Sequence, residues 1–120
     1  MSSFDHSGLM QTIKDSLLPF RKTQAEAMRG FDQLARASMA DGALGGKHKE
    51  LIALAIGVSQ HCSGCIAFHV KALQRLQATR QEVEETLGMA VYMGGGPSLM
   101  YAADAIAAFE QFEKELSAAA

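Results

Sequence analysis

The stretch that decides the fold is KHKELIALAIGVSQHCSGCIAFHVKAL, residues 47–73. Its first half begins with polar residues and becomes almost wholly apolar, which predicts a helix over 47–59 that enters the core. A turn is expected near Gln60 and His61, and a following helix should carry the cysteines and end at about Gln77. The stretch therefore predicts two consecutive helices joined by a short turn.

The segments on either side are also predicted to be helical, because no part of the chain alternates apolar and polar residues for long enough to make a strand. Ser7 is a candidate N-cap for the first helix, and Pro19 is expected to break it. Thr79 and Glu82 have the spacing of a capping box. The expected helices are 7–18, 20–40, 80–93 and 98–117, with a loop at DGALGG (41–46) and a hinge at GGGP (94–97). The prediction is one all-α domain of about six helices that spans residues 1–120.

The composition limits the classes of function. The formal net charge is −2 over 120 residues, so we expect neither a nucleic-acid partner nor a membrane surface. The first ten residues lack the pattern of a signal peptide, and the apolar run Leu51–Ile56 is too short to cross a bilayer. We therefore expect a cytoplasmic, soluble protein. A short chain rich in Leu, Ala and Met is also expected to bury more surface as a homo-oligomer.

Both cysteines of the chain lie beside a histidine. On a helix, Cys62, Cys65 and His69 have i, i+3, i+7 spacing and fall within roughly 60° of arc on one face. A cysteine near a helix start is favoured as a thiolate, and an imidazole one turn away can take the proton of a thiol. A thiolate that attacks a peroxide becomes a sulfenic acid, and a second thiol one turn away condenses with it. This spacing therefore suits a redox pair.

Other interpretations of the three residues stay open. A structural disulfide is disfavoured because ordinary thiols stay reduced in the cytoplasm. A closed zinc site would need a fourth ligand, and His61 adjoins Cys62 and is expected to point elsewhere. Haem attachment would need a histidine directly after the second cysteine, where Ile66 stands. Two inert cysteines near a histidine by coincidence remain possible, whereas a thioredoxin-like protein would show a βαβ pattern that this chain lacks.

Glu50 is the only acid in the apolar stretch that precedes the cysteines. The simplest interpretation is a solvated acid in the first turn of a helix, favoured there by the helix dipole. A helix from 50 to 62 would separate Glu50 from Cys62 by about 18 Å along its axis. Contact with His69 would then need a turn with tilt, a bridging water or a neighbouring subunit.

The remaining polar residues carry weaker signals. His6 and His48 are expected to be solvated. The GGGP segment could hold an anion through its backbone N–H groups, but without the Lys-Ser/Thr of a P-loop a hinge between helices fits it better. Tyr92 and Tyr101 are expected either in a pocket or at a subunit contact.

Residues 43–73, ALGGKHKELIALAIGVSQHCSGCIAFHVKAL, resemble the signature of the AhpD-like alkylhydroperoxidase/carboxymuconolactone decarboxylase family. The family pattern is a Glu, a C-x-x-C that begins twelve residues later, and a His four residues after the second Cys. Glu50, Cys62, Cys65 and His69 match it position by position. A looser similarity continues through residues 78–106, so the resemblance covers roughly half of the chain.

The resemblance implies an all-helical subunit that assembles as trimers or hexamers, and a thiol peroxidase that needs no cofactor and no metal. By analogy, Cys65 would attack the hydroperoxide, and Cys62 would resolve the sulfenic acid and accept electrons from a thiol or dithiol donor. His69 would be the base, and Glu50 would complete a proton relay through His69 and water.

Two other functions remain open beside this resemblance, and the chain departs from the family pattern at two positions. Family members that decarboxylate a lactone acid typically lack the cysteine pair, and a non-catalytic redox-sensing or metal-binding subunit is also conceivable. The AhpD proteins proper carry a His just before the second cysteine, where this chain has Gly64, which bears on the proton relay. Family members often have a Gly where Gln77 stands, which is expected to affect only loop geometry.

Overall fold

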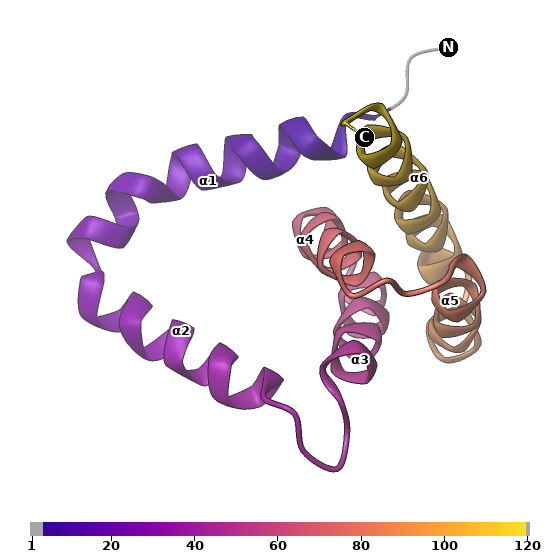
Figure 1. Cartoon of the computed structure of the whole chain (residues 1–120), viewed down its shortest axis with the longest axis horizontal. Helices are drawn as coiled ribbons and strands as arrows, with labels where there is room; N and C mark the ends of the chain where they lie inside the picture. Colours follow the sequence, from indigo (N-terminus) through magenta and orange to yellow (C-terminus); the bar gives the residue numbers. More distant parts are fainter. Residues whose placement is uncertain (1–3, 120) are drawn as a thin grey trace.

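The computed structural model describes residues 4–119, and six α-helices account for nearly all of them (Figure 1). No strand occurs in this range, so the all-α prediction is confirmed. The helices are α1 (His6–Thr23), α2 (Ala25–Met39), α3 (Gly46–Ser59), α4 (Ser63–Arg75), α5 (Arg80–Gly94) and α6 (Gly96–Ala119). None of these helices is both long and apolar enough to pass through a bilayer.

The core lies among the last four helices. The apolar run predicted to enter it does so, because Leu54 and Val58 of α3 are fully buried. Helix α4 packs against both α3 and α6, which places the cysteine segment at the centre of the fold. The other fully or almost fully buried apolar side chains of the core include Ile66, Val70, Leu73, Val83, Leu87, Ala105, Ala108 and Phe112.

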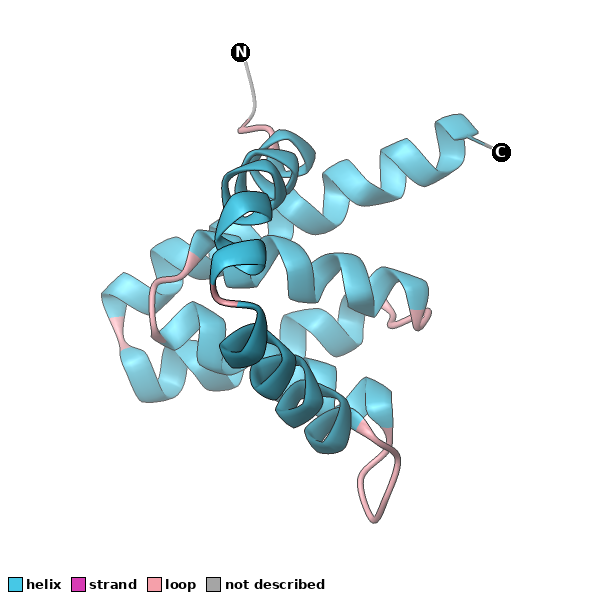
Figure 2. Ribbon diagram, turned by 90° about the vertical axis from the view of Figure 1, so that its left-hand side faces the viewer, coloured by secondary structure: helices cyan, strands magenta, loops and turns pink. Residues whose placement is uncertain are grey.

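The first two helices form an arm that stands away from the core, and we use the name arm for residues 11–39. Figure 1 shows α1 leaving the end of α6 and α2 returning to α3, and in Figure 2 the arm crosses in front of the other helices. No residue from 11 to 49 is buried. Packing therefore anchors the arm through α1, which contacts α4 and α6, and through the contact of α2 with α3.

The predicted break at Pro19 is wrong. Helix α1 continues through Pro19 to Thr23, and the chain turns at Gln24 instead. A proline inside a helix removes the backbone hydrogen bond to the carbonyl four residues earlier. Pro19 is exposed, so water can satisfy that carbonyl. The helix predicted over 20–40 accordingly begins later, at Ala25.

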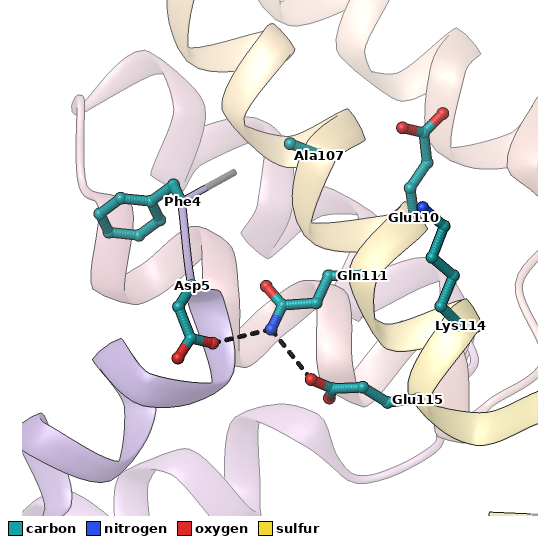
Figure 3. Close-up of a pocket in the computed structure, with 7 residues that line it drawn as sticks. All are labelled: Phe4, Asp5, Ala107, Glu110, Gln111, Lys114 and Glu115. Carbon is teal, nitrogen blue, oxygen red and sulfur yellow. Dashed lines mark hydrogen bonds between the residues drawn. The ribbon is translucent and has the colours of Figure 1, made fainter. Parts of the chain in front are cut away.

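The N-terminus of α1 is capped by Asp5 and not by Ser7 as predicted. The amide of Gly8 donates to Oδ1 of Asp5 at 3.0 Å, whereas the Ser7 hydroxyl donates to Glu115 on α6 at 2.6 Å. The Gln111 side chain donates to both Asp5 and Glu115, at 2.8 and 2.9 Å (Figure 3). The hydrogen bond from Gln111 is the main reason why the pKa of Asp5 lies below its ordinary value. These contacts tie the start of α1 to α6.

His6 is fully buried, so the prediction that it is solvated is wrong, whereas His48 is exposed as predicted. The Nε2 atom of His6 lies 2.8 Å from Oδ1 of Asp104, and its backbone N–H donates to Oε1 of Gln111 at 2.7 Å. Burial of an imidazole is tolerated when its ring nitrogens have partners. His6 therefore acts as the anchor of α1 on α6.

The ends of the later helices follow the predicted signals. Thr79 and Glu82 form a capping box at the start of α5. Gly95 has φ 75°, a conformation that favours glycine, and it separates α5 from α6 as the hinge prediction required. Pro97 then lies in the first turn of α6, where its missing N–H is tolerated.

Gln77 follows the end of α4 and has a left-handed backbone conformation that glycine would adopt more easily. Its φ is 61°, and its amide and that of Ala78 donate to Gln74 and Leu73 in a Schellman motif. A left-handed non-glycine residue costs roughly 1–2 kcal/mol. Gln77→Gly should therefore raise the free energy of unfolding by about 1 kcal/mol in urea denaturation.

The matched control for this prediction is Gln77→Ala, which keeps the steric penalty of a Cβ and should bring no comparable gain. Equal stability of the glycine and alanine variants would contradict the explanation.

Candidate redox site

A three-residue reversal, residues 60–62, joins α3 to α4 and places the two helices side by side. His61 is left-handed, with φ 57°. Its amide donates to the carbonyl of Val58 at 3.1 Å, and the amide of Cys62 donates to that of Gly57 at 3.0 Å. This is again a Schellman motif, with His61 at the position where glycine is usual. The chain therefore turns back on α3 immediately before the first cysteine.

The two cysteines lie at the N-terminal end of α4 and are joined by a disulfide, with their Cα atoms 5.2 Å apart. The prediction that helix geometry begins at Cys62 is wrong by one residue. Cys62 is extended and serves as the N-cap of α4, and its Sγ accepts the amide N–H of Cys65 at 3.1 Å. The predicted proximity of the sulfurs to a helix start is confirmed.

Glu50 and His69 are in direct contact within one chain. Nδ1 of His69 lies 2.6 Å from Oε1 of Glu50, and the Glu50 side chain is only 11% exposed. The interpretation of Glu50 as a solvated acid is therefore wrong, and no bridging water or neighbouring subunit is needed. The reversal at His61 closes the gap, because α4 returns along α3 and brings its second turn back to the level of Glu50.

A glycine allows α3 and α4 to approach each other beside the disulfide. A Cβ on Gly57 would lie 3.2 Å from Cβ of Cys65, which is closer than side chains usually pack. His69 follows Cys65 by one turn of α4, on the same side of the helix. The structure thus brings the four predicted site residues together as two linked pairs, Cys62–Cys65 and Glu50–His69.

Helix α1 accounts for the glycine between the cysteines. A Cβ on Gly64 would lie 2.9 Å from Cδ1 of Ile13. The arm therefore covers the position at which AhpD proteins proper carry a histidine. The other nearby imidazole does not replace it, because His61 stacks on Tyr101 with ring centroids 4.9 Å apart and planes within 9°.

A cavity of about 410 Å³ opens at the start of α4, where Ser63 lines it. The residues that line it are Phe4, Ser63, Met100, Tyr101 and Asp104. Sequence reasoning considered Tyr101 for a pocket without placing it, and it missed Ser63 and Asp104. Only the position of Ser63 between the cysteines could have pointed to it. Asp104 follows them by some forty positions and carries no local signal.

The zinc interpretation finds no support in this geometry. Among residues 4–119, no three His, Cys, Asp or Glu side chains are arranged to hold a metal ion. Both candidate thiolate ligands are joined to each other. The site instead combines a disulfide-bonded cysteine pair with a carboxylate–imidazole pair.

Comparisons with a family model and with a solved structure indicate the same protein family. The model of the carboxymuconolactone decarboxylase family matches residues 25–108. An uncharacterized protein from Cupriavidus necator is 40% identical over 89 residues, which cover 74% of this chain and 79% of that protein. An uncharacterized protein of the cox locus of Paracoccus denitrificans is 34% identical over 83 residues, covering 69% and 75%.

Two solved structures are similar over most of the chain. A carboxymuconolactone decarboxylase family protein from Legionella pneumophila, solved in its apo form, is 58% identical, with a TM-score of 0.88, and the match covers 89% of this chain and 96% of that one. A protein from Thermotoga maritima is 21% identical, with a TM-score of 0.79 and coverage of 93% and 96%. The second likeness concerns the fold alone.

Proposed function

Because this chain belongs to the carboxymuconolactone decarboxylase family, we propose that it is a thiol-dependent peroxidase of the AhpD-like type. It reduces hydroperoxides through a dithiol/disulfide cycle of Cys62 and Cys65. The observation that carries the proposal is the position of this sulfur pair, at a helix N-terminus and one turn from a histidine held by a buried carboxylate. Decarboxylation of a lactone acid would give the sulfur pair no role.

The proposed cycle begins with the thiolate of Cys65. It attacks the terminal oxygen of a hydroperoxide, the O–O bond breaks, and the products are an alcohol and the sulfenic acid of Cys65. The Cys62 thiol then attacks the Cys65 sulfur and releases water, which forms the disulfide. The hydroperoxide gains two electrons and the two thiols lose them. A small thiol or a dithiol donor protein restores both thiols by disulfide exchange.

His69 serves as the proton carrier in this scheme. A carboxylate accepts hydrogen bonds only, so the short contact with Glu50 places the proton of a neutral His69 on Nδ1. Nε2 is then free to take the thiol proton of Cys65 and to return a proton to the alkoxide leaving group. Glu50 fixes the tautomer and stabilises the imidazolium, as buried carboxylates do beside other catalytic histidines.

The proposed partners follow from the same thiol cycle and from the apolar side chains exposed on the surface of the chain. They are a small hydroperoxide, a thiol or dithiol electron donor and further copies of this chain in a trimer or hexamer, without a cofactor, a nucleic acid or a membrane. Exposed Phe31 and Leu34, at 61% and 63%, support self-association because large apolar side chains are rarely left uncovered in clusters. We place the reaction in the cytoplasm, where thiols are kept reduced.

The test is mass spectrometry of the two thiols. The reduced protein is treated with one equivalent of cumene hydroperoxide, quenched with an alkylating reagent and digested. We expect both cysteines to be lost to alkylation and recovered as a Cys62–Cys65 disulfide, and dithiothreitol should restore both thiols. Two cysteines that remain alkylated at the level of an untreated sample would overturn the proposal and favour a non-peroxidatic subunit.

A further inference from the structure

The cavity of about 410 Å³ at the start of α4 extends to the first half of α6. None of the four predicted site residues lines it, and its lining consists of Phe4, Ser63, Met100, Tyr101 and Asp104. The volume falls in the range of roughly 300–1,000 Å³ that is usual for small-molecule sites. Phe4 and Met100 are 57% and 65% exposed, so a small molecule can enter the cavity from solvent at these two walls.

The cavity and His69 lie on opposite sides of α4. At about 100° per residue, Ser63 lies about 160° of arc from Cys65, whereas His69 lies about 40° from it. Ser63 also directly follows Cys62 in the chain. The cavity therefore begins one residue from the proposed resolving cysteine, on the side of the helix away from the proposed base.

Two aromatic contacts hold the walls of the cavity in place. The ring of Tyr101 is stacked on His61, with centroids 4.9 Å apart and planes within 9°. The ring of Phe4 meets that of the buried His6 edge to face, with centroids 4.8 Å apart. His61 directly precedes Cys62, so the first contact also links the cavity to the reversal. Walls that are already fixed lower the ordering cost of binding a ligand.

The lining suits an uncharged molecule with an apolar body. Three of its five residues supply aromatic rings and a thioether, and Ser63 adds a hydroxyl. Asp104 is the only charged residue in the lining, and its ion-pair partner within residues 4–119 is His6, which is charged only when protonated. No lysine or arginine lines the cavity. An anion would lose hydration there without gaining a cation, so the cavity disfavours anionic ligands.

We propose that the cavity binds the small thiol that reduces the Cys62–Cys65 disulfide, and that it selects thiols with an uncharged, apolar body. This inference rests on the reductive half of the proposed function and narrows the electron donor to one chemical class. The hydroperoxide approaches Cys65 from the side of His69, and the donor approaches Cys62 from the side of α6. The two reactants therefore do not compete for one binding site.

The reductive step consists of two thiol–disulfide exchanges. The donor thiolate attacks Sγ of Cys62, the S–S bond breaks, and Cys65 leaves as a thiolate that the N-terminus of α4 stabilises. A second donor thiolate then attacks the donor sulfur of the mixed disulfide and releases Cys62. The two donor thiols lose two electrons as they form a donor disulfide, the protein disulfide gains them, and the two protons pass to the cysteines.

The test measures how fast two probe thiols, benzyl mercaptan and 4-(mercaptomethyl)benzoate, reduce the disulfide form of the protein. The probes share the thiol and the aromatic ring and differ in one remote carboxylate. Samples are quenched with acid, alkylated and analysed by mass spectrometry. The rate with benzyl mercaptan should level off at high concentration and exceed that with the anionic probe about 10-fold. No hydroperoxide is present, so a failure of this inference is distinguishable from a failure of the proposed peroxidase activity.

Met100→Lys places a cation in the wall of the cavity at an exposed position, so the fold should survive, which circular dichroism verifies. The rate with the anionic probe should rise to within about 2-fold of that with benzyl mercaptan, because the lysine gives the carboxylate a partner. The matched control is Leu99→Lys, which adds the same charge at the neighbouring exposed residue outside the lining. It should keep the wild-type ratio of the two rates.

Three results would overturn the proposal. The first is a wild-type disulfide that both probes reduce equally fast without saturation, or that neither probe reduces. The second is a Met100→Lys variant with the same ratio of rates as Leu99→Lys. The third is a Met100→Lys variant that keeps the wild-type ratio for the thiols but is oxidised more slowly by cumene hydroperoxide, which would place the hydroperoxide in the cavity instead.

Discussion

The Cys65→Ser variant should lose hydroperoxide turnover by at least about 1,000-fold, because removal of a catalytic nucleophile eliminates the reaction path itself. The serine hydroxyl is not ionised near neutral pH and cannot form a sulfenic acid. The side chain of residue 65 lies at a close approach of α3 and α4, and serine is smaller than cysteine, so the fold should be retained. The measurement is the rate of cumene hydroperoxide consumption with dithiothreitol as donor.

Cys62→Ser is the matched control, because it keeps the attacking thiol and removes the resolving one. It should consume one equivalent of hydroperoxide and stop at a sulfenic acid, which dimedone traps on Cys65. The reverse pattern, with trapping in the Cys65→Ser variant only, would exchange the roles of the two cysteines. Undiminished turnover of a lactone acid by the double serine variant would instead identify a decarboxylase.

The Glu50→Gln variant should lower kcat/KM for hydroperoxide by about 100-fold, the lower range of general acid–base contributions. Glutamine keeps the volume of the side chain and can still accept a hydrogen bond from Nδ1 of His69. It removes the negative charge that stabilises the imidazolium, and its NH₂ group can turn to hold the ring in the wrong tautomer. The measurement is steady-state kinetics over a range of hydroperoxide concentrations.

Glu113→Gln provides the comparison for this prediction, because it makes the same chemical change on the exposed side of α6 and should leave kcat/KM unaltered. Glu50→Gln should retain the single-turnover disulfide, only formed more slowly. If Glu50→Gln reacts as fast as Glu113→Gln, the carboxylate is a structural partner of His69 and not part of a proton relay.

Local sequence signals predicted most of the helices and the helices on which the site residues lie. The Thr79–Glu82 capping box and the apolar run before the cysteines act over a few residues, and both appear as expected. The Glu50–His69 contact could not be predicted from the residues alone, because a distance counted along one helix axis assumes that the helix continues. The turn near His61 was expected, but a histidine at the left-handed position of a Schellman motif does not show that the turn is tight enough to bring α4 back along α3.

Contacts between distant parts of the chain account for the other errors. The partners of His6 lie 98 and 105 positions further along, so no local pattern distinguishes its burial from solvation. Pro19 was expected to end a helix because proline usually does, but on an exposed arm the lost hydrogen bond is tolerated.

The capping role of Cys62 has a consequence for how the two oxidation states differ. Its sulfur accepts the Cys65 amide at 3.1 Å, and a free thiolate at the same place can accept it too, so we expect reduction to leave the tip of α4 in the same shape. If the pair cycles as proposed, the change of oxidation state should need little reorganisation of the surrounding protein. A partner that distinguishes the oxidised from the reduced form would then be expected to contact the two sulfur atoms themselves.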